Sequence, residues 1–324
     1  MQSFSIERHN NGTLQSTEDA VTYNGTYNSS YNDQGDSLYR ILGKHLMYGL
    51  ILVISCMGFF GNGIVIWLLG FRLRRKPFTT YILNLAVADF AFLLSLEFFY
   101  SIPCDSGVLH EIAECLLDFT YNTGQLLLTA ISIDRCVSVL FPIWHRCVRP
   151  THLSTTVCAL LWVLSCLLCI ILYIVEVIYP IPPWLEKTGQ YLLTGLLCFP
   201  LMTISTVILF IKVCFKSHPR KRGRLLTVIL LTLLFFLMLA FPLNAMILAI
   251  YIVGPHTPVE LRYGFLCASL NSSVNPLLYF LVGRKKGGRS RESLMVILQR
   301  VLNEEENDKQ EMGTSCSIPL RNLS

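Results

Sequence analysis

The chain has 324 residues, of which 53% are hydrophobic and only 15% are charged, with a formal net charge of +5. Ordinary soluble domains carry about 25% charged residues, so this composition excludes a soluble globular protein and predicts an all-α integral membrane protein. Most cysteines lie inside apolar stretches and none has zinc-ligand spacing, which argues against a disulfide framework and against a structural metal site.

Residues 1–43 are polar and lack the apolar core of a signal peptide. Their composition, rich in Asn, Ser, Thr and Tyr, predicts a disordered tail. Three sequons in this tail predict N-glycosylation at Asn11, Asn24 and Asn28. Glycosylation would place the N-terminus outside the cell.

Seven apolar stretches follow, within a predicted membrane domain covering residues 44–283. About 20 apolar residues suffice to cross the hydrocarbon core as a helix, so each stretch predicts one membrane span. The spans cover about residues 46–71, 78–102, 112–140, 153–178, 190–213, 225–251 and 263–282.

The positive charges agree with this count. With the N-terminus outside, only five of the 26 Lys and Arg residues fall on the outer side: Arg8, Arg40, Lys44, Lys187 and Arg262. All the others fall inside, as the positive-inside rule requires. The basic character therefore describes a cytoplasmic surface facing anionic lipid or an acidic partner, and not a nucleic-acid site.

Small residues and prolines predict how the spans pack and bend. Gly58, Gly61, Asn62 and Gly63 in the first span should allow another helix to approach closely. Prolines inside later spans should weaken the backbone hydrogen bonds and place kinks. These prolines are Pro200, Pro242 and Pro276.

Placing an ionisable side chain in hydrocarbon is unfavourable in free energy, so such residues inside the spans indicate functional positions. Asp89 lies deep in the second span, and the third span is polar along most of its length. A helix this polar is tolerable only among other helices or beside water, so we expect the third span to be central. Asp134 and Arg135 stand at its cytoplasmic end, before Pro142, and suggest a charge pair that can change partners.

After the last span, residues 284–302 alternate basic and apolar side chains in a pattern that predicts an amphipathic eighth helix on the inner membrane surface. Residues 303–324 form an acidic cytoplasmic tail that we expect to be disordered.

Several marks together resemble the rhodopsin-like (class A) G-protein-coupled receptors. They are Asn62, Asp89, Asp134-Arg135-Cys136, Trp162, Pro200, Pro242 and Asn275-Pro276-x-x-Tyr279. More narrowly, YNTGQLLLTAISIDRCVSVLFPIWHRC and NSSVNPLLYFLVG are similar to the Mas-related receptor group. The resemblance implies a seven-transmembrane helix bundle, no enzymatic activity, and a multi-pass location in the plasma membrane.

The resemblance also implies roles for individual residues. Coupling to a heterotrimeric G protein, of the Gq or Gi class, would use Asp134, Arg135, Ile143 and Tyr279. An internal sodium or switch site would use Asp89, Asn271, Ser272 and Asn275, although Gly124 lacks the hydroxyl expected from the third span. No other cofactor is expected. Arrestin would bind the tail near Thr314, Ser315 and Ser317.

The sequence also departs from the class pattern. His110 replaces the usual cysteine at the top of the third span, so we predict no disulfide there. Ala240 replaces the usual tryptophan before Pro242, and Arg222 stands where the class often has an acid. We therefore expect Asp134 to be the chief resting partner of Arg135.

Thirteen of the 21 acidic residues fall outside or in the outer halves of the spans. This excess favours a cationic ligand, either a basic peptide or a small amphiphilic cation. The candidate ligand-binding residues are Asp118, Glu176, Glu97, Glu114 and Tyr121, with aromatic support from Phe98 and Tyr100. A solvated acidic rim is the alternative for any one of these carboxylates.

Other function classes find less support. A transporter would need internal repeats or discontinuous helices, and an intramembrane hydrolase would need a nucleophile with its base or a metal cluster. The sequence has neither pattern. A ligand-independent or constitutively active receptor-like modulator of other receptors stays open beside the ligand-activated receptor.

Overall fold

The computed structural model describes residues 15–72, 77–103, 107–178, 183–215 and 258–283, together with part of the stretch 230–246. Regular structure in these residues is helical: α1 (Gln15–Trp67), η1 (Leu68–Arg72), α2 (Pro77–Ser101), α3 (Val108–Leu140), η2 (Trp144–Val148), α4 (Leu153–Ile178), α5 (Pro183–Phe215) and α7 (Pro258–Gly283). The elements η1 and η2 are single turns of π-helix. The chain forms two compact units, Met1–Gly49 and Leu50–Ser324.

Helix α1 begins at Gln15, within the segment 1–43 that the sequence predicts to be disordered. No proline interrupts residues 15–67, and extending an existing helix costs far less than starting one. The backbone at Asn24 and Asn28 is therefore helical, while Asn11 lies outside the described residues. Glycosylation at the three sequons stays a prediction.

Five of the described helical stretches are long and apolar enough to cross a membrane: Ile41–Arg72, Pro77–Ser101, Val108–Leu140, Leu153–Val175 and Gly195–Lys212. They correspond to the first five predicted spans. Helix α7 contains the predicted seventh span, and the described part of 230–246 is helical within the sixth. The predicted eighth helix, residues 284–302, and the tail after it lie outside the described residues.

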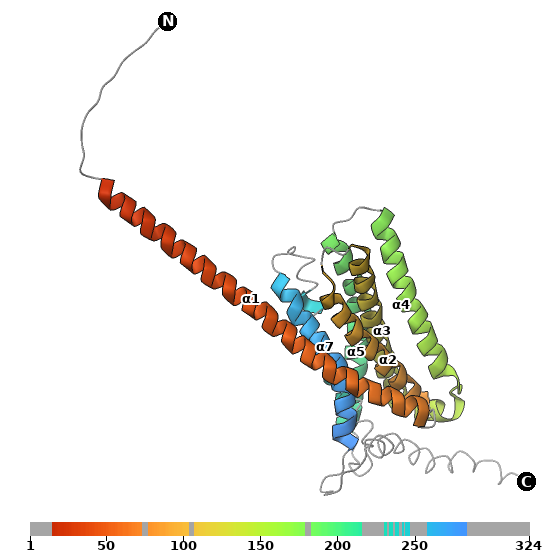
Figure 1. Cartoon of the computed structure of the whole chain (residues 1–324). Coiled ribbons are helices and arrows are strands. Elements are labelled where there is room, and N and C mark those ends of the chain that lie inside the picture. The colour runs from red at the N-terminus through yellow and green to blue at the C-terminus, as the bar shows by residue number, and fades with distance from the viewer. Residues whose placement is uncertain are drawn as a thin grey trace, which may run out of the picture. The chain divides into compact units, whose positions relative to one another are not determined.

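Helix α3 lies at the centre, as its polarity predicts, and packs against α2, α4 and α5 (Figure 1). Four of its buried hydroxyl groups form hydrogen bonds within the helix. The hydroxyls of Thr120, Thr123, Thr129 and Ser132 each donate to a carbonyl one turn earlier in α3. These hydrogen bonds satisfy each hydroxyl within α3 itself. The apolar side chains of α3 can therefore form the core with the neighbouring helices.

That core joins the helices along α3. Leu127, Leu128 and Ile131 of α3 pack in one buried cluster with Leu85 of α2 and Leu209 of α5. A second cluster, nearer the start of α3, combines residues of α1, α2, α3 and α7. Both clusters are aliphatic and aromatic, so α3 is held mainly by apolar packing.

The glycines of α1 allow close contact with α7, as predicted. A Cβ atom at Gly58 would overlap Ser273 Oγ and approach Leu93 Cδ1 to 2.6 Å, and one at Gly61 would lie 3.0 Å from Pro276 Cβ. Two polar contacts use this proximity: Asn62 Nδ2 donates to the Ser272 carbonyl at 3.0 Å, and Ser273 Oγ donates to the Ile54 carbonyl at 3.0 Å.

Two of the predicted kink prolines lie inside continuous helices, Pro200 in α5 and Pro276 in α7. The backbone at Pro242 is also helical. A proline removes one backbone donor and crowds the preceding turn, so each position is a local weak point in its helix. Kinks at these prolines stay a prediction.

The tight contact at Gly58 generates a stability prediction. Gly58→Ala should destabilise the protein by about 1–3 kcal/mol, because the added methyl group overpacks the α1–α7 contact. Thermal unfolding of detergent-solubilised protein measures this. Gly63→Ala is the matched control, since its Cβ would meet Phe90 Cε2 at an ordinary 3.7 Å. Equal melting temperatures for the two variants would contradict the packing argument.

Candidate functional site

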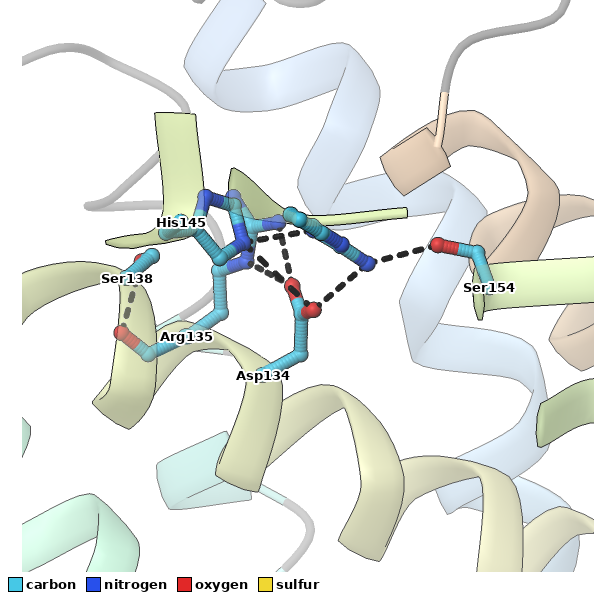
Figure 2. A network of polar contacts seen from close by, with 6 residues as sticks. Asp134, Arg135, Ser138, His145 and Ser154 are labelled. Atoms are coloured by element: carbon cyan, nitrogen blue, oxygen red, sulfur yellow. Dashed lines mark hydrogen bonds and ion pairs between the residues drawn. The ribbon is translucent and has the colours of Figure 1, made fainter. Parts of the chain in front are cut away.

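The main candidate site is a buried ionic cluster at the end of α3 (Figure 2). Arg135 Nη2 contacts Asp134 Oδ2 at 2.6 Å, and Arg135 Nε donates to the same oxygen at 3.2 Å. Both side chains are nearly covered, with 5% and 9% of their surfaces exposed. The predicted pair of adjacent opposite charges is therefore formed.

Two further side chains reach Asp134 from the loop after α3. Arg149 Nη2 contacts Asp134 Oδ1 at 2.8 Å, and His145 Nε2 lies 3.6 Å from the same oxygen. Arg149 also donates to Ser154 Oγ at 2.6 Å, which ties the cluster to the first turn of α4 (Figure 2). We call Asp134, Arg135, His145, Arg149 and Ser154 the Asp134 cluster.

The local chain path explains this arrangement. Helix α3 ends before Phe141, whose N–H donates to the Val137 carbonyl. Pro142 then redirects the chain into the π-helical turn Trp144–Val148, and the His145 N–H donates to the Phe141 carbonyl. This turn folds the loop back over the end of α3, which brings His145 and Arg149 beside Asp134.

The cluster combines one carboxylate with two guanidinium groups, so positive charge is in excess. Arg149 Nη1 also contacts His145 Nε2. The carboxylate of Asp134 lies between two guanidinium groups, of Arg135 and Arg149.

This geometry extends the sequence prediction, in which Asp134 was chiefly paired with Arg135. The analysis of the sequence did not identify His145, Arg149 and Ser154. The segment WHRCVR, residues 144–149, contains three basic residues shortly after Pro142, and this segment could have indicated further partners for Asp134. A buried carboxylate needs more than one partner, and the nearest basic segment in the chain supplies the others.

Arg135 also packs against α2. Its guanidinium carbon lies 4.0 Å from the centre of the Phe78 ring, and its backbone carbonyl accepts a hydrogen bond from Ser138. The cation–π contact compensates for part of the lost hydration. If Arg135 left Asp134, the carboxylate would still have Arg149 as a charged partner.

A second polar network lies deeper in the helices and brings the predicted switch residues together. Asn275 Nδ2 of α7 donates to Asp89 Oδ2 of α2 at 2.7 Å, and Ser272 also hydrogen-bonds with Asp89. Asn271 is buried on the same helix, as expected for a sequon inside a span.

Sodium binding at Asp89 remains a prediction. The carboxylate and the Ser272 hydroxyl are oxygen ligands of the type a sodium ion uses, but Gly124 offers none. A Cβ at Gly124 would lie 3.9 Å from Asp89 Oδ1, so a side chain could fit at this position. In the present arrangement, the Asn275 amide donates to the carboxylate directly.

The predicted ligand-binding residues lie in the C-terminal parts of α2 and α4 and in the N-terminal half of α3. Glu97, Glu114 and Asp118 are partly buried, whereas Tyr121 is buried and packs on Phe92 with ring centres 5.7 Å apart. Glu176 belongs to the last turns of α4, but its side chain is outside the described residues.

An aromatic cluster joins the outer ends of α2, α3 and α7. The Phe99 ring lies 4.9 Å from the His110 ring and 6.4 Å from the Phe265 ring, and Tyr100 also packs near Phe265. Phe98, the predicted aromatic contact for a ligand, is 39% exposed, whereas the neighbouring Phe99 is in this cluster. A contact between Phe98 and a ligand stays a prediction.

The remaining coupling residues are on the same side as the Asp134 cluster. Ile143 is 75% exposed, directly after Pro142. Tyr279 lies in α7, with a side chain outside the described residues. Among the described residues, no group of three or more His, Cys, Asp and Glu side chains could hold a metal ion.

Comparison with known proteins agrees with this architecture. The family model described as 7 transmembrane receptor (rhodopsin family) matches residues 61–279, which run from α1 to the Tyr279 motif. The chain belongs to this receptor family. It is 36% identical to the rat (Rattus norvegicus) proto-oncogene Mas over 295 residues, covering 86% of this chain and 90% of that protein.

Two further relatives place the receptor in the Mas-related group. Mas-related G-protein coupled receptor member D of Macaca fascicularis is 40% identical over 277 residues, covering 80% of this chain and 86% of that protein. Member H of Rattus norvegicus is 40% identical over 271 residues, covering 81% and 84% respectively. The receptor is therefore a multi-pass protein of the plasma membrane whose partners are G proteins, and it is not an enzyme.

The Asp134 cluster generates a prediction about stability. Arg149→Met should lower the stability of the receptor by about 1.5–3 kcal/mol, because a buried carboxylate loses a charged donor. Arg72→Met is the control, since Arg72 is exposed. Thermal unfolding should show non-additive losses for Asp134→Asn combined with Arg149→Met. Strictly additive losses would mean that the two side chains do not interact.

Proposed function

We propose that this receptor is activated by a cationic ligand, a basic peptide or an amphiphilic cation, at its outer side. The acidic side chains beside the aromatic cluster are the observation that carries this proposal. The contact of Phe99 with His110 brings the outer ends of α2 and α3 together. Glu97 and Glu114 each lie within about one helical turn of that contact.

Partial burial makes these carboxylates effective for binding. Glu97, Glu114 and Asp118 are neither fully exposed nor fully covered. An approaching cation can reach them, and their electrostatic attraction is screened less than it would be in bulk water. The faces of Phe99, Tyr100 and Phe265 add a surface on which a guanidinium or ammonium group can stack. A cation therefore finds both charge and aromatic partners there.

We propose that ligand binding is transmitted to the Asp134 cluster through a change in helix packing. A ligand shifts such an equilibrium only by its differential affinity for the two arrangements. In the active arrangement Arg135 leaves Asp134 and contacts the G protein, while Arg149 keeps the carboxylate partnered. The exposed Ile143 then offers an apolar contact to the same G protein, of the Gq or Gi class.

The coupling role of Arg135 has a direct test. Arg135→Ala should leave ligand binding intact and reduce agonist-stimulated guanine-nucleotide exchange by about tenfold or more, because the G protein loses a charged contact. The rate of guanine-nucleotide exchange on purified heterotrimeric G protein is measured with the receptor in nanodiscs. Arg72→Ala is the control, because it removes an exposed guanidinium outside the Asp134 cluster, and it should preserve exchange. Undiminished exchange in Arg135→Ala would refute the role.

The ligand site has a separate test. A panel of Lys- and Arg-rich peptides is applied to cells expressing the receptor, with calcium and cyclic AMP as readouts. Asp118→Asn should weaken the potency of an active peptide by about tenfold or more, because a charge-assisted contact is lost. Glu111→Gln, on the exposed first turn of α3, should change potency little. Signalling insensitive to every peptide and to Asp118→Asn would favour a constitutively active modulator.

A further inference from the structure

The carboxylate of Glu97, in the C-terminal part of α2, lacks the kind of partners that Asp89 and Asp134 have. Its Oε1 atom is buried and accepts no hydrogen bond. Within the part of the chain that the structure describes, no basic side chain forms an ion pair with Glu97. A carboxylate held in this way in a membrane helix indicates a functional position.

Two neighbours determine how this carboxylate can be approached. Ser55 of α1 is buried and lies beside it, with a hydroxyl that forms no well-aligned hydrogen bond. Tyr100 follows one turn later in α2, on the same face as Glu97. The Tyr100 ring packs against Phe265 of α7, with ring centres 6.4 Å apart. Glu97 therefore lies beside α1 and about one turn from the aromatic contact with α7.

The burial of Oε1 limits which atoms of Glu97 can meet a cation. The side chain as a whole is partly exposed. At most one carboxylate oxygen, Oε2, is therefore accessible to an approaching ligand. Contact with both oxygens would require the surrounding helices to separate.

A single accessible oxygen suits an ammonium group better than a guanidinium group. A guanidinium gains its advantage by donating two parallel hydrogen bonds to the two oxygens of one carboxylate. This advantage is lost when one oxygen is covered. An ammonium is a compact point charge with three donors, and one oxygen is enough for it. The aromatic rings can stack with either cation, so the carboxylate decides between them.

We propose that Glu97 makes the ligand site selective for a primary ammonium group, a lysine side chain or a free amino terminus, over a guanidinium group. The ammonium contacts Glu97 Oε2 and the face of the Tyr100 ring. This inference rests on the proposed cationic ligand and names its chemical class. Other positive charges of the same ligand remain available to Asp118.

Two matched peptides test this selectivity. Hexalysine and hexaarginine, each amidated at the C-terminus and carrying the same dye at the N-terminus, are titrated against purified receptor in phosphatidylcholine nanodiscs. Fluorescence anisotropy gives the dissociation constants, and nanodiscs without receptor give the background. Hexalysine should bind the wild type about fivefold or more tighter than hexaarginine, because the guanidinium cannot use both oxygens of Glu97.

Glu97→Gln should remove this preference. The substitution keeps the shape of the side chain and abolishes its charge, so hexalysine should bind about tenfold more weakly. The ratio of the two dissociation constants should fall to about one. Glu111→Gln, which removes an exposed carboxylate on the first turn of α3, is the matched control and should leave the ratio unchanged. Thermal unfolding checks that both variants are folded, and the comparison of the two peptides on the wild type needs no variant.

Equal or tighter binding of hexaarginine by the wild type would overturn the inference, and so would an unchanged ratio in folded Glu97→Gln. In either case, weaker binding of both peptides by Asp118→Asn would still support a cationic ligand, so only the role of Glu97 would be wrong. If neither peptide binds the wild type, the inference is also wrong, and the wider peptide panel then decides whether the receptor has a cationic ligand.

Discussion

A carboxylate buried inside a helical membrane bundle needs charged or hydrogen-bonding partners, and this requirement shapes the receptor at two levels. Asp134 is held by Arg135, by the loop after α3 and, through Arg149, by the first turn of α4. Asp89 is held by Asn275 of α7. Removing either set of partners would leave a charge whose burial costs several kcal/mol. A helix movement that breaks one of these contacts must therefore supply another partner for the buried carboxylate.

The other polar contacts between helices form a frame around these two networks. Asn62 and Ser273 link α1 to α7, Trp162 donates to Asn84 and links α4 to α2, and Ser165 donates to the Phe119 carbonyl and links α4 to α3. The hydroxyls of α3 bond mostly within their own helix. Apolar packing thus holds α3, and apolar surfaces can shift between alternative arrangements without breaking hydrogen bonds.

Much of this architecture could be predicted from the sequence, because hydrocarbon imposes simple rules on length and polarity. The bounds of α4, the central place of α3 and the approach of Gly58 to α7 followed from those rules. The contacts that were not predicted depend on local geometry. Phe99 was not singled out from the sequence, and it contacts His110 and Phe265. Arg149 reaches Asp134 only because a π-helical turn folds the loop back, and hydropathy carries no signal for such a turn.

The ligand site and the coupling site differ in how their carboxylates are partnered. Asp134 has two guanidinium partners, whereas Glu97 has no charged partner in the described part of the chain. A ligand cation therefore supplies a partner that the protein itself does not provide, while the release of Arg135 removes one of the two that Asp134 has. A ligand that binds one arrangement more tightly then shifts the coupling equilibrium, and G-protein binding must alter the affinity of that ligand by the same factor.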